Sequence, residues 1–406
     1  MKKLIFTALL FCATLSSFAQ NMYDALDFSV NNYYGTARSI GLGNAVTALG
    51  GDLGTIGINP AGSAVSSYGQ FTMTPGLTMS VNNTTMTIDG RTTSELSKRT
   101  RMTFPNIGIN FVVDTYRTRG LKSYSFGMTT NTSDVYTDRA YGAGTGMQTS
   151  LAGAIAAGTE AAARQYGYTY QDFNSYDSFY NTSIPWDYLV GYQSGLTSDF
   201  GDGYSYIGST EIADQNDDGT YNVFTAGDLN QSYLRRVSGS KQDIVMNFGM
   251  NFNDNFYLGF NLGLPVASYS FYEQFNEKAL NPSDFSFSYD DGTEVMFFSD
   301  EYRYAYTASY SGIYAKAGFI WLPTPSLRIG GAIQTPTLYT ITEKFQIGAS
   351  TLFNDGSLSA SSPENEYVYD LTSPYRANFG VAYTIGRVGL VSVDYELCDY
   401  STMKFS

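Results

Sequence analysis

Residues 243–264 read DIVMNFGMNFNDNFYLGFNLGL, and the alternation of their side chains decides the fold. On both sides of the turn at Asn253–Asn255, every second residue is apolar and its neighbours are mostly small or polar. The apolar positions are Ile244, Met246, Phe248, Met250, Phe252, Phe256, Leu258, Phe260, Leu262 and Leu264. Two segments of period two around a short turn predict a β-hairpin. One continuous apolar face opposite a small polar face is inside-out relative to a soluble sandwich and typical of strands that face lipid.

A second hairpin, around Gly386-Arg387, places charges opposite its apolar face. Phe379, Val381 and Tyr383 share one face, whereas Arg376 lies on the other. Since a basic side chain facing lipid at the midplane costs up to about 2–4 kcal/mol, a watery lumen is the better environment. We expect five such charges to face a lumen, where they pair with one another or with a plug, or alternatively bind a solute carboxylate: Lys316, Arg328, Arg376, Asp394 and Glu396.

Short turns and long polar segments alternate along the chain, as they do between the two ends of an outer-membrane barrel. The predicted strands are 70–81, 102–115, 121–131, 242–252, 256–271, 303–322, 327–345, 367–385 and 388–403. The fold class is therefore an all-β, antiparallel transmembrane β-barrel. About nine strands is an odd number where bacterial barrels have even counts. We expect missing carboxyl-terminal strands and an open sheet whose first and ninth strands are unpaired.

Composition excludes several classes of protein. The chain has 37 acidic and 23 basic residues, which argues against nucleic acid as a partner. It has no histidine, so we expect no enzyme of the histidine-dependent barrel types and no cofactor. Residues 1–19 form a basic, then apolar, then small-residue segment typical of a signal peptide; Cys12 lies inside the apolar run, which argues against a lipoprotein. No later segment has the roughly 20 apolar residues that a membrane-spanning helix needs.

Between the signal peptide and the first strand, residues 38–64 read RSIGLGNAVTALGGDLGTIGINPAGSA. Glycine and alanine dominate this stretch, so its side chains are too small to form a hydrophobic core of their own. Glycine permits close approach of backbones and Pro60 stiffens the tail, which predicts a compact plug and not a linker. The predicted organisation is a signal peptide at 1–19, a plug at 20–68 and a partial barrel at 69–406 with a long extracellular loop at 132–241.

This plug resembles the amino-terminal hatch of the FadL/TodX family of outer-membrane transporters for hydrophobic compounds. The family signature stands here as Asn59-Pro60-Ala61, followed by Gly62. The stretches AGFIWLPTPSLRIGGAIQTP (317–336) and FGVAYTIGRVGLVSVDYELCDYS (379–401) resemble two of its hairpins. The resemblance implies a protein of the Gram-negative outer membrane, surrounded by its lipids, that takes up hydrophobic molecules such as long-chain fatty acids by passive diffusion.

The resemblance also implies a ligand pocket beside the plug and a sideways exit where the third strand kinks. Gly127 is the candidate for that kink, because glycine marks bends within strands. Two other functions stay open: a porin for polar solutes, and a structural or surface-interaction barrel that transports nothing. An apolar pocket next to the plug would favour the hydrophobic channel over both.

Two features lie within the predicted extracellular loop. Residues 146–164, GMQTSLAGAIAAGTEAAAR, predict a helix that either packs the loop onto the rim or forms a lid. Asp214, Asn216 and Asp218, followed by Gly219, have the spacing of a calcium loop, but Thr225 replaces the glutamate expected at its twelfth position. A polar surface turn is therefore the favoured interpretation and no metal site is expected.

Overall fold

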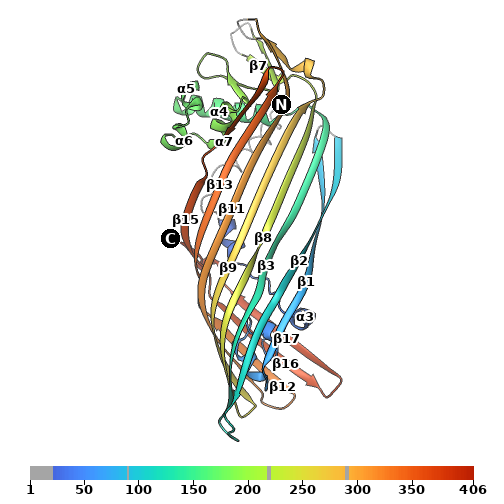
Figure 1. Ribbon diagram of the computed structural model, residues 1–406, viewed down its shortest axis with the longest axis vertical. Coiled ribbons are helices and arrows are strands. Elements are labelled where there is room, and N and C mark those ends of the chain that lie inside the picture. Colours follow the sequence, from blue (N-terminus) through green and yellow to red (C-terminus); the bar gives the residue numbers. More distant parts are fainter. Residues whose placement is uncertain (1–21, 89–90, 217–220, 289–291) are drawn as a thin grey trace.

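The computed structural model describes residues 22–88, 91–216, 221–288 and 292–406. Most of this chain forms antiparallel strands, nine of which build one curled sheet with the shape of a half barrel (Figure 1). Its strands in spatial order are β1 (Gln70–Ile88), β2 (Arg91–Asp114), β3 (Leu121–Met147), β8 (Leu229–Phe252), β9 (Phe256–Ala279), β11 (Glu294–Trp321), β12 (Leu327–Gln334), β16 (Arg376–Ile385) and β17 (Gly389–Cys398). The predicted signal peptide and Cys12 lie outside the described residues.

Two of the predicted strands are each interrupted. The 327–345 segment forms β12 and β13 (Leu338–Phe353), and the 367–385 segment forms β15 (Asn365–Thr372) and β16. Pro336 lies in the first gap, where a residue without a backbone N–H does not continue the ladder. As a result, β11 pairs with β12 near one end and with β13 near the other. The remaining pieces of this sheet are β10 (Ser286–Ser288), β14 (Gly356–Ser361) and β18 (Lys404–Phe405).

The predicted long loops are shorter than expected, because the strands run on past their apolar segments. The loop predicted at 132–241 reduces to residues 148–228, since β3 and β8 pair up to Met147 and Leu229. The other predicted loops shorten in the same way. Short turns gather at one end of the sheet, here the turn end. The connection 148–228 lies at the opposite end, here the loop end (Figure 1).

The two faces of the sheet differ as the alternation predicts. On β9, Phe260 and Leu262 are 48% and 42% exposed, whereas Asn261 between them is 5% exposed. The apolar side chains therefore lie on the convex face and the small polar ones on the concave face. Within the described residues, β1 pairs only with β2 and β17 pairs only with β16. The sheet is therefore open between its two edge strands, β1 and β17, as predicted.

The helices lie in two places. The amino-terminal segment, residues 22–66, contains α2 (Met22–Ser29), α3 (Ala37–Gly41) and the short 3-10 turns η1 (Leu53–Thr55) and η2 (Pro60–Val65). The loop end carries α4 (Leu151–Tyr166), α5 (Tyr170–Asn174), α6 (Ser178–Asn181) and α7 (Trp186–Gln193). In the same region β4 (Thr197–Asp199) pairs with β5 (Tyr206–Gly208), and β6 (Glu211–Gln215) pairs with β7 (Tyr221–Thr225). Two further 3-10 turns are η3 (Pro282–Phe285), between β9 and β10, and η4 (Tyr400–Thr402), which follows β17. Of the described helices, none combines the length and the apolar character needed to cross a bilayer.

Candidate functional site

The amino-terminal segment packs against the concave face of the sheet, and its Asn59-Pro60 pair is one of the points where it is fastened. Pro60 begins η2, where its missing N–H leaves no helical bond unmade. The Asn59 side chain caps that turn by accepting from the N–H of Ala61 at 3.1 Å. Its Nδ2 donates to the carbonyl oxygens of Thr47 at 2.6 Å and Phe319 at 2.9 Å. The motif therefore joins two parts of the segment to β11.

Glycines of the sheet allow this close contact. A Cβ atom added to Gly259 would lie 2.2 Å from the carbonyl carbon of Pro60, and one added to Gly318 would lie 2.2 Å from Asn59 Oδ1. Neither distance is compatible with a side chain. The small face of these strands is thus shaped to the backbone of η2.

Basic side chains of the sheet donate to backbone carbonyls of the amino-terminal segment. The contacts are Lys241 Nζ to Phe28 O (2.7 Å), Lys316 Nζ to Gly57 O (2.7 Å), Arg328 Nη1 to Leu49 O (2.8 Å) and Arg376 Nη2 to Ser29 O (2.5 Å). Hydrogen bonds from charged donors are stronger than neutral ones, about 1.5–3 kcal/mol each. These four residues therefore hold the segment at four separate carbonyls.

The two predicted acids contact the same segment. Asp394 Oδ2 accepts from the Thr47 N–H at 2.7 Å. Glu396 accepts from the Tyr33 hydroxyl at 2.9 Å and from Arg376 Nη1 at 2.5 Å. Burial and the neighbouring Glu396 carboxylate raise the pKa of Tyr33, so its hydroxyl stays a hydrogen-bond donor. All five charges predicted to face a lumen thus lie against residues 22–66.

The backbone ladder has an opening between β2 and β3, which side chains of β1 and β2 cross. Their pairing ends at Asn106 and Asn131, although β2 stays paired with β1 and β3 with β8 far beyond this level. A β-bulge at Ser133 marks the separation. Here the amino-terminal segment takes the place of β2, because the N–H groups of Asn32 and Tyr34 donate to the oxygens of Ser133 at 2.7 Å and Thr132 at 3.0 Å.

The candidate kink residue lies below this opening. Gly127 is paired on both sides, with Asn110 of β2 and Asn247 of β8, in a continuous register. The register of β3 with β8 shifts at three other places, between Leu121 and Ser123, at Ser133, and between Thr145 and Met147, and the shift at Ser133 is the one beside the opening. No glycine marks that position, and the bulge became visible only from the register of the paired strands.

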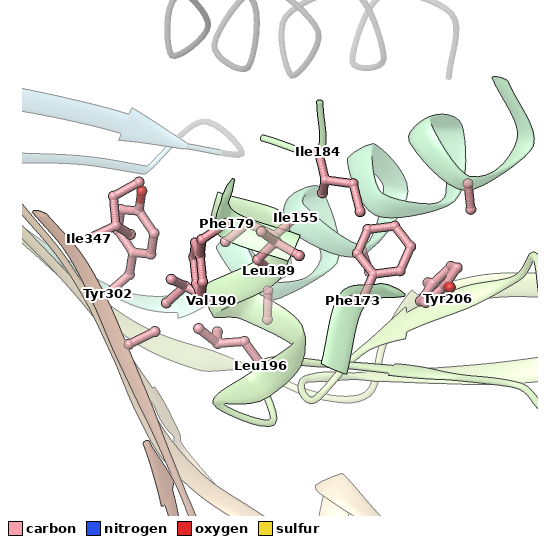
Figure 2. Close-up of a cluster of buried hydrophobic side chains, with 14 residues drawn as sticks. Ile155, Phe173, Phe179, Ile184, Leu189, Val190, Leu196, Tyr206, Tyr302 and Ile347 are labelled. Atoms are coloured by element: carbon pink, nitrogen blue, oxygen red, sulfur yellow. The ribbon is translucent and has the colours of Figure 1, made fainter. Parts of the chain in front are cut away.

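The helices at the loop end form a core of their own against the sheet. Phe173, Leu189 and Val190 pack together, and the cluster closes on Tyr302 of β11 and Ile347 of β13 (Figure 2). The predicted helix at 146–164 is α4, which begins at Leu151 and ends at Tyr166. Glu277 of β9 accepts from the first N–H groups of α4, at 3.1 Å from Leu151 and 3.2 Å from Ala152, which fixes this helix to the sheet.

A series of aromatic rings runs along the concave face between the two helical groups. The rings form three contact groups, with neighbouring centroids 4.8–6.2 Å apart: Trp186, Phe345, Tyr304 and Phe271; then Tyr306, Tyr269 and Tyr136; then Tyr310 with Phe28. The hydroxyls of Tyr136 and Tyr310 are hydrogen-bonded to each other at 2.9 Å. These inner rings were not singled out from the sequence, because their alternation with polar residues is weak. Other aromatic residues, such as Trp321 and Tyr383, are exposed on the convex side.

The calcium-like spacing is only partly described. Asp214 lies in β6, and the oxygen of Asn216 accepts from Asn222 Nδ2 at 2.7 Å. Asp218 and Gly219 lie outside the described residues. Among the residues that the structure describes, no three side chains form a metal-binding group.

No family model, curated protein or solved structure matches the chain. The site is therefore interpreted from its own geometry.

Proposed function

We propose that this protein is an outer-membrane channel for the passive uptake of hydrophobic molecules such as long-chain fatty acids, with residues 20–68 as its plug and the curled sheet as part of a barrel wall. The aromatic series on the concave face is the observation that carries this proposal. A polar-solute porin needs a wetted, polar passage, whereas these three groups of rings place aromatic side chains at intervals along the concave face between α7 and α2.

The exposed apolar band supports placement in a membrane. On β1 and β2 the convex face presents large apolar side chains, including Leu77 at 78% exposure and Met79 at 67%. Exposed apolar surface of this extent is characteristic of contact with another apolar phase. Contact with lipid accounts for the exposed apolar band that all nine strands of the curled sheet share.

The opening between β2 and β3 supports a sideways exit into that lipid. A hydrophobic solute that leaves there avoids crossing water. Asn32 and Tyr34 fill the lower part of the gap with two backbone hydrogen bonds, so release of this short stretch frees the edge of β3 there while the rest of the plug stays held. The resemblance of Asn59-Pro60-Ala61 to the FadL/TodX hatch agrees with this role for the segment.

A disulfide across the closed gap tests the exit. Tyr34 and Thr132 are directly paired, and residues so paired have Cα atoms within the range that a disulfide spans. In a Cys398→Ser background, Tyr34→Cys with Thr132→Cys should abolish uptake of a labelled long-chain fatty acid by cells that lack their own transporter. Reductant should restore it.

The matched control places the disulfide elsewhere in the wall. Met128 and Met246 are paired between β3 and β8 on the convex face, so Met128→Cys with Met246→Cys should leave uptake unchanged. Unimpaired uptake by the oxidised Tyr34/Thr132 variant would rule out the exit at this gap. Absence of uptake by the unmodified protein would instead reject the hydrophobic channel and favour a porin or a structural barrel.

A further inference from the structure

The convex face carries a groove of about 490 Å³ that crosses β8, β9, β11 and β13. Hydroxyl groups line it, from Ser238, Ser268, Ser270, Thr307, Ser309 and Thr342. They alternate with inward-facing residues outside the lining, which are Phe271 on β9 and the buried Tyr310 and Glu343 on β11 and β13; Gly239, Tyr269 and Ala308 belong to the lining between the hydroxyls. The hydroxyls therefore point away from the plug and the aromatic series.

The groove begins where the apolar band ends. On β9 the exposed Val266 precedes Ser268, and on β11 the exposed Ile313 lies just below Ser309. The same change occurs on β13 between Leu338 and Thr342. If the band lies in hydrocarbon, as the proposed function requires, the groove lies at the level of the lipid headgroups on the loop-end side.

Two arginines border the groove. Arg99 and Arg101 of β2 reach past β3, and each donates one Nη1 hydrogen bond to β8, to Val237 O at 2.8 Å and to Gly239 O at 2.5 Å. Across residues 22–88, 91–216, 221–288 and 292–406, neither forms an ion pair. The rest of each guanidinium can serve an anion. Lys344 also borders the groove, but it is paired with Glu364 and Glu366.

We propose that this groove binds the phosphorylated sugar headgroup of a lipid in the surrounding leaflet. The proposal rests on the proposed membrane placement but is independent of transport. Arginine presents a planar fork of donors that matches phosphate, and a row of hydroxyls can both donate to and accept from a sugar. The volume lies within the roughly 300–1,000 Å³ of ordinary ligand sites.

The test compares lipid retention by variants in nanodiscs. Arg99→Gln with Arg101→Gln removes both charges and keeps a polar side chain at each position. In phosphatidylcholine nanodiscs doped with bisphosphorylated lipid A, native mass spectrometry should show retention of that lipid by the unmodified protein. The double variant should retain about tenfold less, in line with loss of charge-assisted hydrogen bonds. The unmodified protein should retain dephosphorylated lipid A as weakly as the double variant retains the bisphosphorylated lipid.

Arg117→Gln with Arg119→Gln is the matched control, since it removes two exposed charges at the turn end and should retain the lipid fully. Circular dichroism of each inserted variant verifies that the sheet is intact. Equal retention by the Arg99/Arg101 variant would overturn the proposal, as would displacement of the lipid by inorganic phosphate alone, which would indicate a free-anion site. Failure of the unmodified protein to enter nanodiscs would reject the membrane placement itself, and a loss of fatty-acid uptake with lipid retention intact would reject only the channel.

Discussion

At the residue scale, the absence of a side chain at Gly259 decides whether the amino-terminal segment can dock. The segment contributes its backbone to this contact, and the sheet contributes a surface without Cβ atoms. Charged donors then bind the carbonyls that the short turns of the segment leave without helical partners. The five charges named from the sequence could be placed on the lumen side because period two fixes the face. Lys241 was missed because it fell at the edge of a predicted loop.

Gly259→Ala should loosen the amino-terminal segment and leave the sheet folded. The added Cβ would lie 2.2 Å from the Pro60 carbonyl carbon, and backbone cannot yield as a flexible side chain does. Overpacking of this kind costs about 1–3 kcal/mol. We expect faster proteolysis within residues 22–66, measured by mass spectrometry of the fragments, with an unchanged β-sheet circular dichroism spectrum. Gly389→Ala, whose Cβ would meet nothing within 4 Å, is the control, and equal protection of both variants would contradict the prediction.

At the element scale, strands could be predicted where one face is consistently apolar, and not beyond that band. The prediction ended strands at residues 81, 131 and 271, whereas β1, β3 and β9 continue to Ile88, Met147 and Ala279. Above the apolar band both faces carry polar and aromatic residues, so the alternation weakens although the pairing persists. The gap between β2 and β3 could not be predicted from the sequence. It depends on where two neighbouring strands stop pairing with each other, and the β-propensity of single residues does not report this.

The helical group at the loop end should be more stable at acidic pH. Asp187 of α7 accepts from the Tyr302 hydroxyl at 2.8 Å, and burial raises the pKa of Asp187, although this hydrogen bond opposes the shift. A carboxyl with a raised folded-state pKa binds more protons when folded, so its stabilising effect is full below the unfolded pKa of about 4 and is lost as pH rises through the folded pKa.

Hydrogen exchange of α7, corrected for intrinsic rates, should therefore slow as the pH is lowered from neutral. In Asp187→Asn, which cannot ionise, this part of the pH dependence should vanish. Glu160→Gln, which removes a half-buried acid on α4 that pairs with Arg164, should keep this pH dependence. Identical pH profiles for the protein and Asp187→Asn would show that another group is responsible.

At the scale of the whole molecule, one band of exposed apolar side chains unites all nine strands of the sheet, and its position tests the proposed membrane placement. Leu262→Arg on the convex face of β9 should cost about 2–4 kcal/mol of unfolding free energy in a bilayer, as basic residues do near the midplane. Ser268→Arg on the same face, above the band, should cost about 0–1 kcal/mol. The measurement is denaturant unfolding in phospholipid vesicles. Similar costs at both positions would show that Leu262 does not face hydrocarbon.

The contacts that hold the amino-terminal segment join the two ends of the chain. Tyr33 meets Glu396 and Ser29 meets Arg376, partners separated by 363 and 347 positions. Contacts of such high sequence separation form late and slowly, because the intervening chain must first be closed into a loop. The part of the protein that is synthesised first therefore reaches its final place last. Until it does, the concave face is uncovered, so assembly passes through a state in which the sheet is paired and its inner surface is still exposed.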